Sequence, residues 1–243
     1  MKVLVTGASS GIGKSIAELL ARKGNIVCGI GQRSKVSFSL KEEQRKNLFY
    51  KRCNVASSSD VLRLKKKLNK KGFSPDTIIL SAGIYPDDIH PQYNSDIFRQ
   101  TFETNLFGSM NFVEAYLPEF LAKRHGHFIT LSSIAAFRPN IRGISYPSSK
   151  AALSLAFRGL DMQYRRKNVP FSVVYLGPVE TAMWEGKKSF IVAKPQVIAK
   201  KVISAMKSRK QVYYLPFLST LLARASLMIP DKLYVALTQL FLK

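Results

Sequence analysis

Two residues four positions apart, Tyr146 and Lys150, form the pair in this chain best suited to acid–base chemistry. On a helix they lie about 6 Å apart along the axis and share one face. An ammonium beside a phenol favours the phenolate, so the spacing predicts that the pKa of Tyr146 falls from about 10 toward the working pH. Such a tyrosine can give a proton to a carbonyl oxygen or take it back, and Ser133 can hydrogen-bond the same oxygen.

A second segment suited to chemistry is the glycine-rich run Thr6-Gly7-Ala8-Ser9-Ser10-Gly11-Ile12-Gly13. It follows a predicted strand and begins a predicted helix, and a glycine triplet indicates a nucleotide site only in this strand–turn–helix context. The glycines allow the backbone to approach a pyrophosphate, and the helix that starts at Ile12 offers free N–H groups at its positive end. The run therefore predicts a dinucleotide site.

Strands and helices alternate along most of the chain, and these elements must position both segments. Short apolar runs predict strands at Val3–Thr6, Ile26–Ile30, Leu48–Cys53, Thr77–Leu80, His127–Leu131, Phe171–Leu176 and near Val212–Leu215. Helical spacing predicts helices at Ile12–Lys23, Val61–Asn69, Ser95–Phe107, Ser109–Arg124, Tyr146–Asn168 and near Gln196–Ser208. The alternation predicts an α/β fold: a Rossmann-type, doubly wound, mostly seven-stranded parallel sheet with helices on both faces. We expect one such domain over residues 1–214.

The last part of the chain, Leu215–Lys243, differs in composition. It is rich in leucine, carries few charges, and is split by Pro230 into two short helical pieces. Residues 215–243 are expected to form a hydrophobic helical extension of the same domain. Two interpretations stay open: the extension packs on the domain or at a subunit interface, or it lies as an amphipathic hairpin in the plane of a membrane.

The charge balance points to an anionic partner. The chain has 38 Lys+Arg against 15 Asp+Glu, a net charge of +23, which suits an anionic membrane surface, an acidic carrier protein or a phosphorylated cofactor, or reflects only a solvated surface. No nucleic-acid reading motif accompanies it, so nucleic acid is not expected as a partner. Cys28 and Cys53 lie in apolar runs and are expected as buried free thiols, which suits the reducing cytoplasm.

The glycine spacing and the Tyr146-x-x-x-Lys150 pattern together resemble the classical short-chain dehydrogenase/reductase family over roughly residues 1–210. Ser133, thirteen residues before Tyr146, stands at the family's spacing, which favours it over its neighbour Ser132. The resemblance implies a hydride transfer between a nicotinamide and a carbonyl/alcohol pair. It also implies a homodimer or homotetramer, formed through the helices that contain Asn105–Arg124 and Tyr146–Asn168.

The resemblance also assigns roles within the site. It implies a catalytic set of Asn105, Ser133, Tyr146 and Lys150, in which Lys150 also holds the nicotinamide ribose hydroxyls. Asn105 resembles the asparagine that kinks a helix and holds a proton-relay water. No metal is expected, because the histidines His90, His125 and His127 match no metal-ligand or triad spacing.

Further cofactor contacts follow from the same resemblance. Asn54 stands where the family has an aspartate, Leu80-Ser81 replaces its asparagine pair, and Leu176-Gly177 replaces its Pro-Gly. The full expected set is Gly7, Ser9, Ser10, Gly11, Ile12, Gly13, Arg33, Asn54, Val55, Ser81, Ala82, Gly83, Tyr146, Lys150, Gly177, Val179 and Thr181.

The end of the second predicted strand bears on which nicotinamide is used. An NAD enzyme places a carboxylate there to bind the ribose 2′-hydroxyl. Here the residues are Gln32, Arg33, Ser34 and Lys35, which can instead receive a 2′-phosphate. NADP(H) is therefore the predicted preference, with NAD(H) as the alternative.

The loops after the strands predict an apolar substrate pocket. They contribute Tyr85, Ile134, Phe137, Ile141, Trp184 and Phe190. We expect a reductase for an apolar ketone or lipid-derived acyl compound, placed in the cytoplasm, with a peripheral position at the inner face of a membrane as the second option. The alternatives are a 3-oxoacyl-carrier-protein reductase, and a non-catalytic nucleotide-binding regulator that keeps the same fold.

Overall fold

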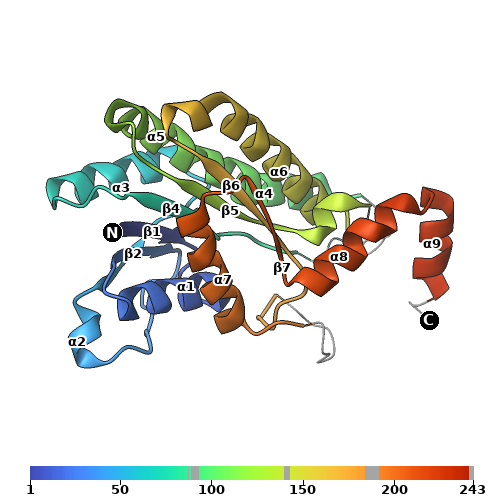
Figure 1. Cartoon of the computed structure of the whole chain (residues 1–243), viewed down its shortest axis with the longest axis horizontal. Coiled ribbons are helices and arrows are strands. Elements are labelled where there is room, and N and C mark those ends of the chain that lie inside the picture. Colours follow the sequence, from blue (N-terminus) through green and yellow to red (C-terminus); the bar gives the residue numbers. More distant parts are fainter. Residues whose placement is uncertain (87, 89–92, 140–142, 184–191, 241–243) are drawn as a thin grey trace.

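The computed structural model describes residues 1–86, 88, 93–139, 143–183 and 192–240 of the 243-residue chain. Within them, seven strands form one parallel sheet in the order β3-β2-β1-β4-β5-β6-β7 (Figure 1). The strands are β1 Lys2–Thr6, β2 Ile26–Gly31, β3 Leu48–Arg52, β4 Thr77–Leu80, β5 Phe128–Ser133, β6 Phe171–Leu176 and β7 Val212–Leu215. The predicted doubly wound parallel sheet is confirmed.

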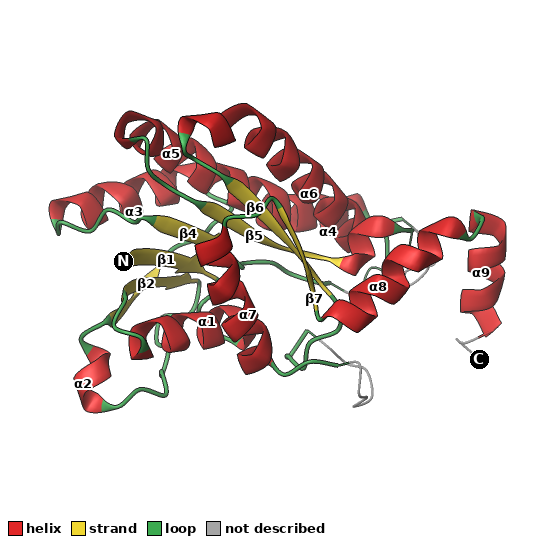
Figure 2. Ribbon diagram, viewed as in Figure 1, coloured by secondary structure: helices red, strands yellow, loops and turns green. Residues whose placement is uncertain are grey.

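Helices cover both faces of this sheet (Figure 2). On one face lie α3 (Ser58–Lys70), α4 (Ser95–Phe102), α5 (Gly108–Lys123) and α6 (Ser145–Tyr164). On the other lie α1 (Gly11–Arg22) and α7 (Pro195–Ser208). Side chains alternate along each strand, so that Leu4 of β1 joins the core under α3, α5 and α6, whereas Val3 and Val5 join the core under α1 and α7.

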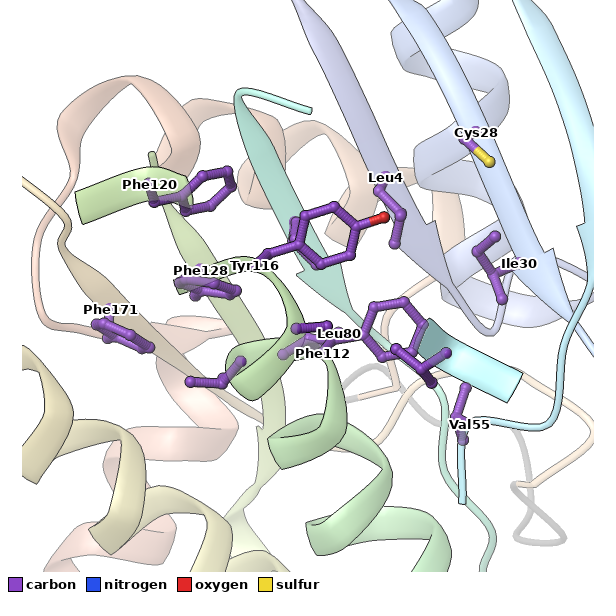
Figure 3. Close-up of a cluster of buried hydrophobic side chains, with 14 of the residues drawn as sticks. Leu4, Cys28, Ile30, Val55, Leu80, Phe112, Tyr116, Phe120, Phe128 and Phe171 are labelled. Atoms are coloured by element: carbon purple, nitrogen blue, oxygen red, sulfur yellow. The ribbon is translucent and has the colours of Figure 1, made fainter. Parts of the chain in front are cut away.

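Aromatic side chains fill much of the core on the α5 side. Figure 3 shows Phe112, Tyr116 and Phe120 of α5 in one cluster with Phe128 and Phe171. The ring centroids of Phe120 and Phe128 lie 4.9 Å apart, and those of Phe128 and Phe171 lie 4.8 Å apart. This packing fixes α5 on β5 and β6, the strands that lead toward the candidate site.

The strand order reverses between β1 and β4, and this reversal sets the place of the site. The chain winds outward from β1 through β2 to β3, and then outward from β4 through β5 and β6 to β7. In such sheets a crevice opens at the carboxyl ends of the strands beside the reversal. Thr6 Oγ1, at the end of β1, accepts hydrogen bonds from the backbone N–H groups of Ser81 (3.0 Å) and Ala82 (3.1 Å), just after β4.

Several elements differ from the sequence prediction. A π-helical segment, η1 (Glu103–Phe107), joins α4 to α5, so Ser95 to Lys123 is one continuous helical run instead of two helices. β5 continues to Ser133, two residues beyond the predicted end. Two short helices were not predicted: α2 (Glu42–Arg45) and η2 (Ile134–Phe137). The helix predicted over Tyr146–Asn168 is α6, and its last turn is the 3₁₀ helix η3 (Arg165–Lys167).

The C-terminal part leaves the sheet at the β7 edge. It consists of α8 (Phe217–Ala225), η4 (Ser226–Met228) and α9 (Asp231–Leu240), which extend away from the sheet in Figure 1. Among the described residues, no helix is long and apolar enough to cross a membrane. Cys28 and Cys53 are buried free thiols, as predicted.

Candidate active site

Tyr146 and Lys150 lie in the first two turns of α6. The start of this helix is held from outside the helix by Asp88, whose Oδ2 accepts hydrogen bonds from the backbone N–H groups of Ile144 (3.1 Å) and Ser145 (2.7 Å). A carboxylate at the positive end of a helix is favourable. Asp88 therefore fixes the turn that carries Tyr146. The sequence analysis did not predict this role for Asp88.

The electrostatics of the pair differ from the expectation. Lys150 is buried; its Nζ donates a hydrogen bond to the Leu131 carbonyl (2.9 Å) and lies 5.7 Å from the centroid of the Tyr146 ring. Burial lowers the pKa of Lys150 to about 8. Burial likewise raises the pKa of Tyr146 to about 12, and a hydrogen bond with Ser133 opposes this rise. The predicted fall in the Tyr146 pKa is thus wrong for the chain alone, because desolvation outweighs the neighbouring groups.

The two adjacent serines point to different surroundings. Ser132 is buried; its Oγ lies 2.6 Å from Ser154 Oγ and donates to the Lys150 carbonyl (3.3 Å). Ser133, the last residue of β5, is half-buried, and its Oγ accepts a hydrogen bond from the Ala135 N–H (3.1 Å). Only Ser133 is brought against the Tyr146 hydroxyl. Ser133 is therefore the serine beside Tyr146, and its catalytic role stays a prediction.

Asn105 lies at the centre of the π-helical segment and is completely buried. Its side chain binds Ile84 twice: Oδ1 accepts from the Ile84 N–H (2.8 Å) and Nδ2 donates to the Ile84 carbonyl (3.0 Å). Nδ2 also donates to Ser149 Oγ (3.0 Å). Asn105 therefore ties the loop after β4 to α6, next to Lys150.

The glycine-rich run forms a cradle with little free space. Gly7 has a left-handed φ of +67°, and a Cβ there would lie 2.8 Å from the Ala82 nitrogen. A Cβ on Gly13 would lie 2.4 Å from the Gly7 carbonyl oxygen. Only glycine fits at these two positions, which brings the start of α1 close to the ends of β1 and β4.

A cleft of about 660 Å³ runs over this cradle from the end of β2 to α6. Of the predicted cofactor residues, those that line it are Gly7, Ser9, Ser10, Gly11, Ile12, Gly13, Val55, Ser81, Ala82, Gly83, Tyr146, Lys150 and Thr181. Asn54 lies beside it, where its Oδ1 accepts from Gln32 Nε2 (3.1 Å) and the Ala56 N–H (3.2 Å). Arg33 follows β2 with an exposed side chain.

These residues fit a nicotinamide dinucleotide. Within the described residues, the first turn of α1 carries no acidic residue, and the side chain of its N-cap residue Ser10 makes no capping hydrogen bond. The backbone N–H groups of this turn can therefore bind an anion. Gly83 stands between Asn105 and Lys150, since a Cβ there would be 3.2 Å from Asn105 Oδ1 and 3.5 Å from Lys150 Nζ. The cleft thus leads from a phosphate cradle to the polar residues of α6.

A smaller cavity of about 260 Å³ adjoins the cleft and shares several lining residues with it, of which Tyr146 carries the phenol proposed for proton transfer. The predicted pocket residues Tyr85 and Ile134 line it, as do Gly177 and Val179, which had been assigned to the cofactor. The other lining residues are Ile12, Ser132, Ser133, Ala135, Leu176, Pro178, Thr181 and Met183.

Phe137 lies elsewhere than predicted. Its ring packs against those of Tyr175 (4.7 Å between centroids) and Tyr214 (6.4 Å), beside the core. A four-residue helical turn after Ser133 directs it there, and this turn had not been predicted. Ile141, Trp184 and Phe190 lie outside the described residues.

Sequence reasoning also missed residues that complete the site. Met183, Ala135 and Pro178 line the cavity, and Gln100 and Thr104 line the cleft. Pro178 and Met183 flank residues that were singled out, so their position after β6 was a usable signal. Gln100 lies in α4, where no neighbouring residue was singled out, and Thr104 lies in the π-helical segment η1 that follows it.

Known proteins with similar sequences and folds agree with this geometry. Residues 1–191 match the family described as short chain dehydrogenase. An uncharacterized oxidoreductase of Listeria monocytogenes is 30% identical over 189 residues, which cover 75% of this chain and 76% of the relative. The 3-oxoacyl-[acyl-carrier-protein] reductase FabG of Escherichia coli is 28% identical over 180 residues, 74% of each chain.

Solved structures share the fold. One described as a short chain dehydrogenase/reductase family protein has a TM-score of 0.77 at 24% identity and covers 88% of this chain and 94% of its own. A 4-hydroxyisoleucine dehydrogenase complexed with NADH also has a TM-score of 0.77, at 18% identity, covering 88% of this chain and 96% of its own. With its matched family, its sheet and its site, this chain belongs to the short-chain dehydrogenase/reductase family of oxidoreductases.

Proposed function

We propose that the chain is an NADP(H)-preferring oxidoreductase that moves a hydride between the nicotinamide and a carbonyl/alcohol pair on an apolar small molecule. The observation that carries the proposal is the position of Tyr146, which lines both the large cleft and the smaller, mostly apolar cavity. A proton donor at this shared wall can serve a substrate oxygen in the cavity while the cleft holds the cofactor.

In this proposal each residue acts on a stated atom. A bound nicotinamide supplies the hydride for reduction or accepts it in oxidation. Tyr146 Oη gives its proton to the substrate oxygen, and Ser133 Oγ donates a hydrogen bond that orients the same oxygen. Lys150 Nζ holds the ribose hydroxyls and places positive charge near the phenol. Asn105 fixes the loop at Ile84 and the neighbouring turn of α6.

The activity is tested with a Tyr146→Phe variant and a panel of apolar ketones. Loss of the hydroxyl is expected to lower kcat for NADPH-dependent reduction by about 10²–10⁴-fold, the usual contribution of a positioned acid. NADPH should still raise the thermal unfolding temperature of the variant, because the rest of the cleft lining is unchanged. A variant with full activity would refute the acid–base assignment, and a wild type that binds NADPH but reduces nothing would favour a non-catalytic regulator.

The NADP(H) preference is supported by the end of β2, where Arg33, Ser34 and Lys35 follow without a carboxylate. A charge-assisted contact contributes about 1.5–3 kcal/mol, so Arg33→Ala should weaken NADPH binding roughly 10- to 100-fold and leave NADH binding nearly unchanged. Arg45→Ala removes the same charge from the exposed helix α2 and serves as the control. Thermal shifts measure the affinity of each variant for NADPH and for NADH. If both variants lose the same NADPH affinity, the assignment of Arg33 is wrong.

A second candidate substrate is a 3-oxoacyl group carried by an acidic carrier protein. It is favoured by the similarity to the Escherichia coli reductase and by the net charge of +23. Turnover of the carrier-bound substrate would then exceed turnover of the same acyl group on a small thiol by at least an order of magnitude at low salt. Equal rates would remove the carrier protein from the proposal.

We further propose that the chain works in the cytoplasm as a homodimer or homotetramer. Two large apolar side chains on α6, Leu155 and Met162, are strongly exposed in the single chain, which supports burial of this helix between copies. Light scattering after size exclusion gives the mass directly. A monomer at micromolar concentration would contradict the assembly.

A further inference from the structure

The C-terminal part of the chain exposes an unusual amount of apolar surface. Seven large apolar side chains within 17 residues are solvent-exposed, with Met228 at 89% and Phe217 at 66% of their surface. We call these residues the C-terminal apolar face: Phe217, Leu218, Leu221, Leu222, Leu227, Met228 and Leu233. Isolated exposed leucines are ordinary, but a cluster of this size marks a surface that binds something.

The orientation of α8 makes this exposure informative. The residues that it buries are Ser219 and Thr220, whereas Phe217, Leu218, Leu221 and Leu222 face outward. The buried hydroxyls bond to the helix's own backbone, with Thr220 Oγ1 donating to the Pro216 carbonyl (2.8 Å). A helix whose outer side met water would have the opposite pattern. The outer side of α8 is therefore built for an apolar surrounding.

The extension is anchored to the rest of the molecule. The Arg138 guanidinium donates to Asp231 (2.9 Å) and to the Ile229 carbonyl, and it stacks 4.5 Å from the centroid of the Tyr234 ring. Arg224 lies 4.4 Å from the ring centroid of Tyr214 in β7. These contacts tie the extension to the rest of the molecule, and α8 and α9 extend from the β7 edge of the sheet (Figure 1).

Charge decides between the kinds of surface that can cover this face. Two copies of the chain carry the same net charge of +23 and so gain no electrostatic attraction, and the oligomer proposed above already has a separate face on α6, with Leu155 and Met162. An anionic bilayer instead attracts the whole molecule and accepts apolar side chains at the boundary of its acyl chains. We propose that the C-terminal apolar face inserts into the surface of an anionic membrane, with α8 and α9 lying on the bilayer.

This contact also names the substrate class, a step that rests on the proposed function. Ser219, on the inner side of α8, packs on Gly177, where any side chain would collide with the Ser219 hydroxyl. Gly177 lines the cavity beside Tyr146. Membrane binding would hold this cavity next to the lipid, so the substrate is a carbonyl or alcohol compound dissolved in the membrane.

The test is sedimentation of the full chain with vesicles of phosphatidylglycerol and phosphatidylcholine, compared with phosphatidylcholine alone. We expect binding to the anionic vesicles, reduced at least tenfold in a Leu222→Glu/Met228→Glu variant. The control is Leu62→Glu/Val197→Glu, which replaces exposed apolar residues on α3 and α7 and changes the net charge equally. The control should lose no more than about threefold, the part owed to charge alone.

Three outcomes overturn the proposal. The first is that the wild type does not bind anionic vesicles. The second is that both double variants lose vesicle binding equally, which would mean that only nonspecific charge attraction is at work. The third is that light scattering shows dissociation of an oligomer in Leu222→Glu/Met228→Glu, which would assign the C-terminal apolar face to a second copy. Reduction of a water-soluble ketone without vesicles tests the proposed function separately, and it should be the same in all these variants. Rates with a vesicle-embedded ketone should fall only in Leu222→Glu/Met228→Glu.

Discussion

Ser133 and Ser132 are neighbours, but their replacement by alanine should affect kcat to very different extents. Ser133 Oγ is the hydroxyl beside Tyr146, so its loss removes a donor aimed at the substrate oxygen. Removal of one such donor lowers kcat by about 10²–10³-fold. Ser132 Oγ is turned away into the contact with Ser154 and the Lys150 carbonyl, so Ser132→Ala should change kcat less than about threefold.

The stability effects of the two changes should be small and similar, which removes unfolding as an explanation. Ser132→Ala leaves Ser154 Oγ with its other bond, to the Lys150 carbonyl (2.7 Å), and costs about 1 kcal/mol. Ser133→Ala loses the bond from the Ala135 N–H and also costs about 1 kcal/mol. Urea unfolding and kcat at saturating NADPH measure both quantities. Equal losses of kcat in the two variants would refute the reasoning.

Three further predictions concern the cradle, the core and the acid–base pair. Gly13→Ala should destabilise the chain by about 2 kcal/mol and abolish thermal stabilisation by NADPH, because the new Cβ would overlap the Gly7 carbonyl. The control is Gly159→Ala, which has open space around the new Cβ and should be neutral or slightly stabilising. Burial lowers the pKa of His127 to about 3, so the unfolded chain binds a proton below pH 6.5 that the folded chain refuses. Unfolding free energy should therefore fall by about 2 kcal/mol between pH 6.5 and 5, and His127→Gln should remove this slope in urea titrations. Reduction should slow above pH 8 as Lys150 loses its charge, and a pH–rate profile of Lys150→Arg should lack this decline.

The parts of the fold that depend on local patterns could be predicted from the sequence. The strands are short apolar runs between turn residues, and their alternation with helices leaves few topologies other than a parallel doubly wound sheet. The glycine cradle was also predictable, because close backbone approach at Gly7 and Gly13 permits no side chain. These features follow from residue types at fixed spacing.

Features that depend on tertiary contacts could not be predicted in the same way. The continuous helix through Asn105 keeps its π-helical turn because the Asn105 side chain bonds to Ile84, which lies 21 residues away in the chain. Asp88 holds the start of α6 across 57 residues. The direction of Phe137 likewise depends on the rings of Tyr175 and Tyr214. No periodicity in the sequence records these partners.

The wrong pKa prediction for Tyr146 shows which physical quantity the residue spacing leaves out. Spacing placed a cation near Tyr146 but said nothing of burial, and desolvation is the largest cause of the raised pKa of Tyr146. With a pKa of about 12, Tyr146 keeps its proton at neutral pH and is ready to donate it to a carbonyl oxygen. In the chain alone Tyr146 is therefore protonated, and its proton transfer in either direction depends on the groups that a bound cofactor and substrate bring beside it.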